Sequence, residues 1–230
     1  MKAALFNEHG SPDVLKYEET DDPIVSNNEV LVRVKACSIN HLDIWIRRGR
    51  TGYSDIQFPH ILGCDISGTI EDSNGATEIN NGDEIIVSPG IGCGICNYCL
   101  QGNDNYCKKF SIIGGWDRKG GYAEFASVPL QNIIHKPRNL SFEESASLPL
   151  TFLTAWNMLV KRAQIKTGEN VLIVGGSSGV GSAAIQIAKL FNCYVFATAG
   201  TEDKLNKMKT LGADFVINHY YPKLKGKNCY

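Results

Sequence analysis

The sequence lacks a dominant charge, long apolar runs and a secretory signal. Its 23 Lys and Arg against 24 Asp and Glu leave a formal net charge of −1, so nothing indicates a nucleic-acid or acidic-membrane partner. No apolar run reaches the roughly 20 residues that span a bilayer. The first residues turn polar after a short apolar stretch, which is unlike a secretory signal. These absences favour a cytoplasmic protein that binds neither nucleic acid nor membrane.

The length of 230 residues allows one large domain or two smaller ones, because single domains usually have about 100–200 residues. Hydrophobic residues make up 43% and charged residues 20% of the chain, values that are ordinary for a globular protein. A sizeable core is therefore expected.

Eight cysteines are present, and four of them fall within fifteen residues: Cys93, Cys96, Cys99 and Cys107. Thiolates at such short spacings on a glycine-rich loop converge on one tetrahedral ion, which favours zinc. Disulfides are the alternative, four of them if all eight cysteines pair, but that use of cysteine suits small secreted chains. A closed shell of four sulfurs leaves no open position for a substrate, so the spacing predicts a structural metal. The scattered Cys37 and Cys193 are expected to be small buried apolar residues.

The first 135 residues are dense in short strand patterns and glycine turns, which predicts a β-rich barrel or sandwich-like domain. Alternating or short apolar runs bounded by turn residues mark the expected strands. These strands are 29–39, 82–90, 120–129 and 132–137.

The pattern changes near residue 141 to alternating helices and strands. Ser141 with Glu144 three positions later is a capping-box pattern. A helix is expected over 151–163, followed by strand 171–176, helix 179–191, strand 193–200, helix 202–212 and strand 213–218. This order is typical of a doubly wound α/β sheet, and the continuous apolar strands fit burial on both faces.

A glycine-rich loop joins the first of these strands to its helix. Such a loop lets the backbone approach a pyrophosphate, while the helix N-terminus presents unpaired N–H groups. Its position after a strand and before a helix favours dinucleotide binding over an ordinary βα turn. The expected cofactor contacts are Gly176, Ser177, Ser178, Gly179, Val180 and Gly181.

The end of the next strand, near Ala199, carries no carboxylate that would bind the ribose 2′-hydroxyl of NAD. Gly200 leaves room for a 2′-phosphate there, and Thr201 and Lys204 are candidates to hold it. This pattern favours NADP(H) over NAD(H). The alternative is that Lys204 is a solvated helix lysine and the cofactor site is unselective.

The chain resembles the medium-chain dehydrogenase/reductase family over residues 1 to about 218. The resemblance rests on the order of the cysteine loop and GGSSGVG, and on the segments NHLDIWIRRG, PHILGCDISG, GGYAEF, LPLTFLTAW and IAKLFNCYVFATAG. It implies a GroES-like catalytic domain over 1–140, with a structural-zinc lobe at about 90–110, and a partial Rossmann domain over 141–230. It also implies an active site in the cleft between them, a small-molecule substrate, and relatives that form homo-oligomers.

The resemblance raises the question of a second, catalytic zinc, which needs three protein ligands and an open position. Alignment on the family motifs places Asn40, Cys64 and Leu150 where zinc-dependent relatives have Cys, His and Cys, and Leu42 where they have a Thr or Ser proton relay. Two interpretations stay open. His41, Cys64 and Asp65 form an atypical zinc site, or the site is zinc-free as in the quinone-reductase-like branch.

The zinc-free interpretation rests on Asn40 and Asp43, which match the Asn-x-x-Asp motif of that branch. The chemistry is then hydride transfer with a quinone, enone, carbonyl or alcohol, whose oxygen needs only a hydrogen-bond donor. The candidate donors are the amide of Asn40, His41 and nearby backbone N–H groups. Local loop bonding is the alternative role for Asn40 and Asp43. Thr154 is expected near the nicotinamide or, alternatively, inside a helix.

The resemblance implies a further hundred or so residues in full-length relatives, and three of the six Rossmann strands are expected here. We therefore expect a C-terminally truncated chain whose sheet exposes an apolar edge. A non-catalytic remnant that binds zinc is the remaining alternative.

Overall fold

A computed structural model describes residues 1–50 and 56–220 of the chain. The described residues separate into two compact units, one that ends at residue 150 and one that begins at residue 151. The domain boundary expected at residue 140 stays a prediction. Within the described ranges, no helix combines the length and the apolar character that a bilayer span requires.

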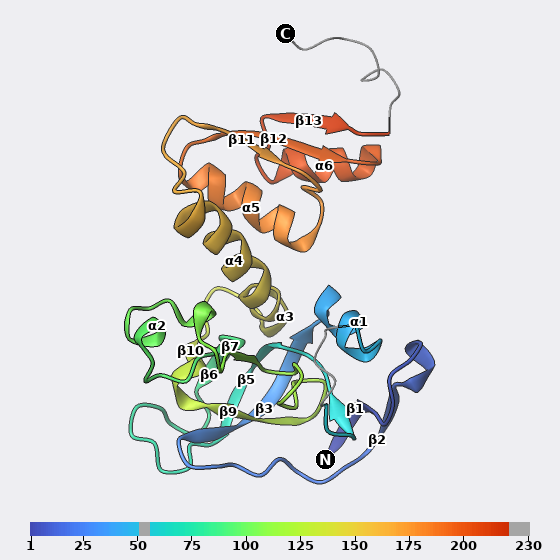
Figure 1. The fold of residues 1–230 in the computed structure, drawn as a ribbon, viewed down its shortest axis with the longest axis vertical. Helices are drawn as coiled ribbons and strands as arrows, with labels where there is room; N and C mark the ends of the chain where they lie inside the picture. The colour runs from blue at the N-terminus through green and yellow to red at the C-terminus, as the bar shows by residue number, and fades with distance from the viewer. Residues whose placement is uncertain (51–55, 221–230) are drawn as a thin grey trace. The chain divides into compact units, whose positions relative to one another are not determined.

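The first unit is built around a five-stranded antiparallel sheet with the order β10-β6-β5-β3-β9 (Figure 1). Its strands are β3 (Glu29–Ser38), β5 (Asp65–Asp72), β6 (Glu84–Val87), β9 (Phe125–Pro129) and β10 (Ile133–His135). A second sheet has the order β2-β1-β4, from β1 (Lys2–Phe6), β2 (Lys16–Glu19) and β4 (His60–Ile61). The short strands β7 (Gly90–Ile91) and β8 (Ser111–Ile112) pair with each other.

The strands expected at 29–39, 82–90 and 132–137 are confirmed as β3, β6 and β10. The strand expected over 120–129 begins only at Phe125, because Gly120 and Gly121 donate their N–H groups to the carbonyls of Ile61 and Gly63, at and just after β4, and not to β3, the strand with which β9 pairs. The strands β1, β2, β4, β7 and β8 and the central strand β5 were not predicted from the sequence. In β5, Gly68 breaks the apolar pattern, yet a Cβ there would lie 2.2 Å from the Arg33 carbonyl oxygen of β3. Glycine is required for this close approach of two backbones.

Short helices connect these strands: α1 (His41–Arg47), α2 (Asn97–Leu100), α3 (Phe142–Ala146) and the 3₁₀ turns η1 (Pro12–Val14), η2 (Asp104–Tyr106) and η3 (Leu130–Asn132). The capping box predicted at Ser141 is confirmed at α3. The Glu144 N–H donates to Ser141 Oγ at 3.1 Å, and the Ser141 N–H donates to Glu144 Oε2 at 2.8 Å.

The main core of the first unit is formed by side chains of the larger sheet. The side chains alternate along β3 and β6, as half-buried strands require. Its most buried members include Val30, Val32, Ile66, Ile70, Ile85 and Val87.

The second unit is a three-stranded parallel sheet with the order β11-β12-β13. Its elements are β11 (Asn170–Ile173), α5 (Gly179–Leu190), β12 (Tyr194–Ala199), α6 (Glu202–Thr210) and β13 (Phe215–Asn218). They are preceded by α4 (Pro149–Trp156), which continues as the π-helical η4 (Asn157–Arg162). This confirms the alternating order that the sequence predicts.

Helices α5 and α6 lie on the same side of this sheet (Figure 1), where α5 contacts β11 and β12, and α6 contacts β12 and β13. The side chains that face the helices form a closely packed core. Its fully buried members include Ala183, Ile185, Ala188, Val195, Ala197 and Met208. Alanine on facing elements allows the helices to approach the strands closely.

Candidate functional site

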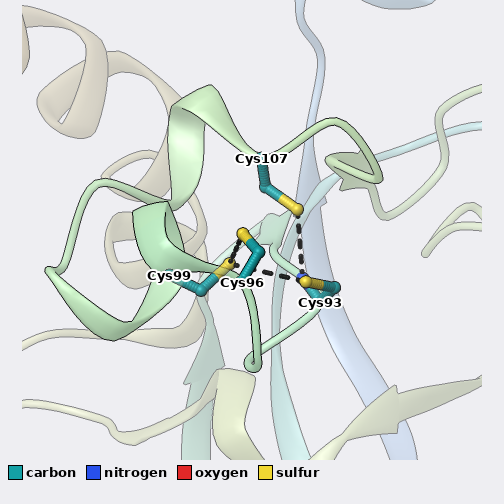
Figure 2. A group of neighbouring side chains, drawn as sticks. All are labelled: Cys93, Cys96, Cys99 and Cys107. Atoms are coloured by element: carbon teal, nitrogen blue, oxygen red, sulfur yellow. Dashed lines mark hydrogen bonds between the residues drawn. The ribbon is translucent and has the colours of Figure 1, made fainter.

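The four clustered cysteines lie on the loop between β7 and β8. Their sulfur atoms point toward a common centre (Figure 2), and all four lie within 4.8 Å of one another. The Cys96 and Cys99 sulfurs are 3.5 Å apart, and those of Cys93 and Cys99 are 4.0 Å apart. The short helices α2 and η2 bend the chain within the loop that carries the four cysteines.

These distances fit a zinc ion. Four thiolates at about 2.3 Å from one zinc, arranged as a tetrahedron, lie about 3.8 Å from each other. The two observed sulfur–sulfur distances bracket that value. A disulfide would require about 2 Å, and none of the seven cysteines among the described residues forms one.

Backbone N–H groups make this loop favourable for thiolates. Hydrogen bonds from the backbone at Ile95 and Cys96 lower the pKa of Cys93 to about 6. The N–H groups of Cys93 and Lys109 donate to Cys107 Sγ at 3.4 and 3.3 Å. Burial raises the pKa of Cys99, so binding at that sulfur requires a metal to displace its proton.

A second polar cluster surrounds Asp65, at the start of β5. This carboxylate is completely buried. Its Oδ2 accepts hydrogen bonds from Asn40 Nδ2 at 2.8 Å and Ser38 Oγ at 3.1 Å, and its Oδ1 accepts from the Leu150 N–H at 2.8 Å. Burial raises the pKa of Asp65, and the three donors oppose that shift.

The amide of Asn40 joins this cluster to Cys64, because Nδ2 also lies 3.6 Å from Cys64 Sγ. Burial raises the pKa of Cys64, with the neighbouring Asp65 as the next cause, so the sulfur is a neutral thiol. Asn40 therefore stands between a thiol and a carboxylate and occupies the space between them with its own donor group.

Asp43 is held by a separate set of donors. Its carboxylate accepts from the Asn40 N–H at 2.7 Å, Tyr122 Oη at 2.8 Å and the Gly63 N–H at 3.3 Å. These contacts fix the start of α1 to the β4–β5 connection. Burial raises the pKa of Asp43. Tyr122 and Ser38 are members of these clusters that were not predicted from the sequence. Ser38 ends β3 two residues before Asn40, whose backbone is still extended, so their spacing of two was an available signal that both face the same side.

His41 lies apart from both clusters. It is exposed at the first position of α1, with its ring 5.5 Å from that of Trp45. In the part of the chain that the structure describes, the Cys93–Cys107 group is the one set of three or more His, Cys, Asp or Glu side chains whose ligand atoms converge. The structure brings Asn40, Cys64 and Asp65 together and does not bring His41 to them.

The glycine-rich loop lies between β11 and α5, as expected. Ser178 is the N-cap of α5, and its Oγ accepts the Gly181 N–H at 3.1 Å. A Cβ on Gly181 would lie 2.4 Å from the Gly175 carbonyl oxygen, so the helix passes this close to the loop only with glycine. This is the close helix–strand packing that a dinucleotide-binding loop needs. Ser177 and Val180 are half-buried, and Ser178 is exposed.

At the end of β12, Thr201 is the N-cap of α6 and Lys204 is exposed in its first turn. The space beside Gly200 differs from the expectation. A Cβ there would meet the Tyr220 ring at 2.2 Å, because the chain turns after β13 and the His219 N–H donates to the Ala199 carbonyl. Tyr220 therefore occupies the room that the sequence analysis left for a 2′-phosphate. Thr154 is half-buried on α4.

Two family models match the chain. The alcohol dehydrogenase GroES-like domain matches residues 26–138, and the zinc-binding dehydrogenase model matches residues 179–227. The chain is 33% identical over 224 residues to an NAD-dependent alcohol dehydrogenase of Sulfolobus acidocaldarius, covering 95% of this chain and 64% of that protein. It is 32% identical over 231 residues to a quinone oxidoreductase of Pongo abelii, covering 98% and 62%.

Among solved structures, an NAD-dependent alcohol dehydrogenase is similar, with a TM-score of 0.93 and 45% identity over 96% of this chain and 64% of that one. The chain thus spans less than two thirds of the length of these relatives. The fold joins a GroES-like unit to a Rossmann-type unit. The chain belongs to the medium-chain dehydrogenase/reductase family.

Proposed function

We propose that this chain forms part of an NAD(P)-dependent oxidoreductase that transfers hydride to or from a quinone, enone, carbonyl or alcohol, and that it holds one structural zinc. The observation that carries the proposal is the β11–glycine loop–α5 unit, in which the first turn of α5 approaches the Gly175 carbonyl so closely that only glycine fits at position 181. The names of the relatives, alcohol dehydrogenase and quinone oxidoreductase, support the same class.

The residues of the loop fit a dinucleotide. The N-terminus of α5, a helix of 12 residues, offers backbone N–H groups and the positive end of its dipole to phosphate. Ser178 caps one of those groups through its hydroxyl and leaves the loop free of negative charge. The nicotinamide, when bound, supplies the hydride chemistry.

The zinc proposal rests on the cysteine cluster alone. Cys93, Cys96, Cys99 and Cys107 would fill all four positions of a tetrahedral ion, so this zinc would hold the lobe together and take no part in the reaction. The residues around Asp65 do not fit a second zinc, because Asn40 fills the space between Cys64 and Asp65 with a donor. An alcohol dehydrogenase with atypical catalytic ligands is the weaker candidate for this reason.

The substrate oxygen would need a donor other than Asn40. The amide of Asn40 is engaged by Asp65 and Cys64, and the carboxylate of Asp43 accepts three hydrogen bonds. His41 is the exposed member of the proposed catalytic set, which comprises Asn40, His41, Asp43, Cys64 and Asp65. We therefore assign the donor role to His41 and a positioning role to the other four.

Cofactor binding tests the proposal, and Ser178 offers a matched pair of variants. Ser178→Asp keeps a good N-cap but places a negative charge where a pyrophosphate would lie, whereas Ser178→Thr keeps the cap neutral. We expect Ser178→Asp to weaken NADH and NADPH binding at least about tenfold, equivalent to about 1.4 kcal/mol, and Ser178→Thr to bind nearly as the parent does. Titration followed by intrinsic fluorescence measures both.

The same titrations decide between the two cofactors. The absence of a carboxylate at the end of β12 and the presence of Lys204 favour NADPH, although its 2′-phosphate fits only if Tyr220 leaves the space beside Gly200, and two of the relatives are named NAD-dependent. We expect tighter binding of NADPH and loss of this difference in Lys204→Ala. Equal or tighter binding of NADH would refute the preference, and a parent chain that binds neither would refute the enzyme proposal.

A further inference from the structure

The buried carboxylate of Asp65 holds the start of helix α4. Its Oδ1 accepts the N–H of Leu150, the second residue of α4, at 2.8 Å. The first residue of α4, Pro149, has no N–H to donate. The N–H groups at the start of a helix have no acceptor within it, so α4 obtains its acceptor from the distant strand β5. A carboxylate is a strong acceptor for such a group.

The helix before α4 is held by the same pair of strands. Helix α3 ends at Ala146, whose carbonyl oxygen accepts from Ser38 Oγ at 2.9 Å. Ser38 lies directly opposite Asp65 in the pairing of β3 with β5, and its hydroxyl lies 3.1 Å from Asp65 Oδ2. The Ser38–Asp65 pair therefore gives a donor to the end of α3 and an acceptor to the start of α4.

The next residue of α4 packs against the start of α5. A Cβ on Gly179 would lie 3.0 Å from Cγ2 of Thr151, which follows Leu150 in the chain. Gly179 is the first residue of α5 and follows the N-cap Ser178 of the glycine-rich loop. A shift of the first turn of α4 would therefore change the contact that limits where α5 begins.

The rest of α4 belongs to the core of the second unit. Ala155 is fully buried in that core, and Phe152 packs against it. Tightly packed elements transmit a displacement instead of absorbing it. Helix α4 thus begins at an acceptor of the first unit and continues as a packed element of the second.

We infer that Asp65 is a positioning residue for the glycine-rich loop. It fixes the first turn of α4 through the Leu150 N–H, and Thr151 in that turn fixes the first residue of α5. In this role Asp65 needs no contact with cofactor or substrate. The inference rests on the proposed function, because the position of the loop matters through the dinucleotide that it binds.

Asp65→Asn tests the inference, since it removes the charge and places an amide N–H₂ group against the donors Asn40 and Ser38. We expect the hydrogen-bonded amides of Gly181 and Ser182 to exchange about fivefold faster, a size typical of coupling through packed side chains. Hydrogen exchange followed by mass spectrometry measures this rate. Binding of NADH or NADPH, measured by fluorescence titration, should weaken about fivefold as well.

A reciprocal variant should restore both properties. When Asn40→Asp is added to Asp65→Asn, the carboxylate at position 40 accepts from the amide at position 65, whose oxygen remains available for Leu150. Exchange and affinity should then return to within about twofold of the parent chain. Glu29→Gln is the matched control, because Glu29 is also a buried carboxylate of the first unit but is held by Arg118 and Ser127. It should leave the exchange at the start of α5 unchanged.

Thr151→Ser tests the second contact, because it removes the methyl group that faces Gly179 and keeps the hydroxyl. It should speed the same exchange, and the double variant with Asp65→Asn should be no faster than the faster single variant, since both act along one path. Additive effects would overturn the inference, as would unchanged exchange in either single variant.

The two readouts separate this inference from the proposed function. A parent chain that binds neither NADH nor NADPH would refute the proposed function, while the exchange rates would still decide the role of Asp65. A parent chain that binds cofactor, with no change in Asp65→Asn, would overturn the inference alone. Circular dichroism melts identify variants that do not fold, and if Asp65→Asn is one of them, the exchange in Thr151→Ser decides.

Discussion

The buried polar residues of the first unit differ in whether their polar atoms have hydrogen-bond partners. Asp65 and Asp43 each accept three hydrogen bonds, whereas His60 is 2% exposed and its Nε2 has no hydrogen-bond partner. The ring of His60 packs edge-on against Phe6, with centroids 5.6 Å apart. A buried imidazole in this setting resists protonation.

His60 makes the stability of the protein depend on pH. Burial lowers its pKa from 6.5 to about 4, against hydrogen bonds with the backbone of Gly114 and Gly115. Between these two values the unfolded chain binds a proton that the folded chain does not. The free energy of unfolding should therefore fall as the pH drops below about 6.5, by about 2 kcal/mol between pH 7 and pH 5.

Urea unfolding at the two pH values measures this fall. His60→Gln, which cannot be protonated, should remove most of it, whereas His135→Gln, at an exposed position, should leave it intact. An equal fall in the parent and in His60→Gln would show that other groups cause the pH dependence.

At the scale of the element, caps and close contacts decide where helices begin. The loop before α5 and the turn before α3 both use a serine N-cap, Ser178 and Ser141. At α3 the cap is reciprocal, because Glu144 returns a hydrogen bond to the backbone of Ser141. This short helix carries Ala146, whose carbonyl oxygen shares the Ser38 hydroxyl proton with Asp65, so the cap also supports the cluster around Asp65.

Removal of this cap should have a local cost. Ser141→Ala is expected to lower the free energy of unfolding by about 1 kcal/mol, because the Glu144 N–H loses its acceptor. Ser141→Thr keeps an acceptor and should lose less than half of that amount. Chemical denaturation of the two variants provides the measurement, and an equal loss in both would contradict a role for the hydroxyl.

At the scale of the whole molecule, each compact unit has a core of its own. One cluster of buried residues runs from Ala155 to Ala213 in the second unit, and the others lie within the first. The cysteine loop contributes little to these cores, since Cys107 is its one buried cysteine. We therefore expect the loop to depend on a bound ion for its structure.

Metal removal tests this dependence. We expect one zinc per chain by elemental analysis, none in Cys99→Ser, and one in Cys193→Ala, whose sulfur lies outside the cluster. Loss of zinc should increase amide exchange over residues 90–111 and leave β11–β13 protected. Two zinc ions per chain would contradict the zinc-free interpretation of the Asp65 cluster, and unchanged exchange would contradict a structural role.

Local signals in the sequence determined much of this protein. The spacing of the four cysteines, the glycine loop between a strand and a helix, and the alternating elements after residue 141 each predict structure from neighbours along the chain. These features depend on short-range geometry, so they can be recognised without knowledge of the fold. The same holds for the capping box at Ser141.

Only the tertiary structure decided the features that depend on distant contacts. Gly68 interrupts the apolar pattern of the central strand β5, because only a residue without a side chain allows the backbone to approach Arg33. Tyr122 donates a hydrogen bond to Asp43, which lies 79 positions earlier in the chain. The role of Asn40 as a donor to Asp65 and the closure of the space at Gly200 by Tyr220 have the same origin. Their physical reason is that a side chain's hydrogen-bond partners and free space are set by segments that the fold, and not the sequence order, brings together.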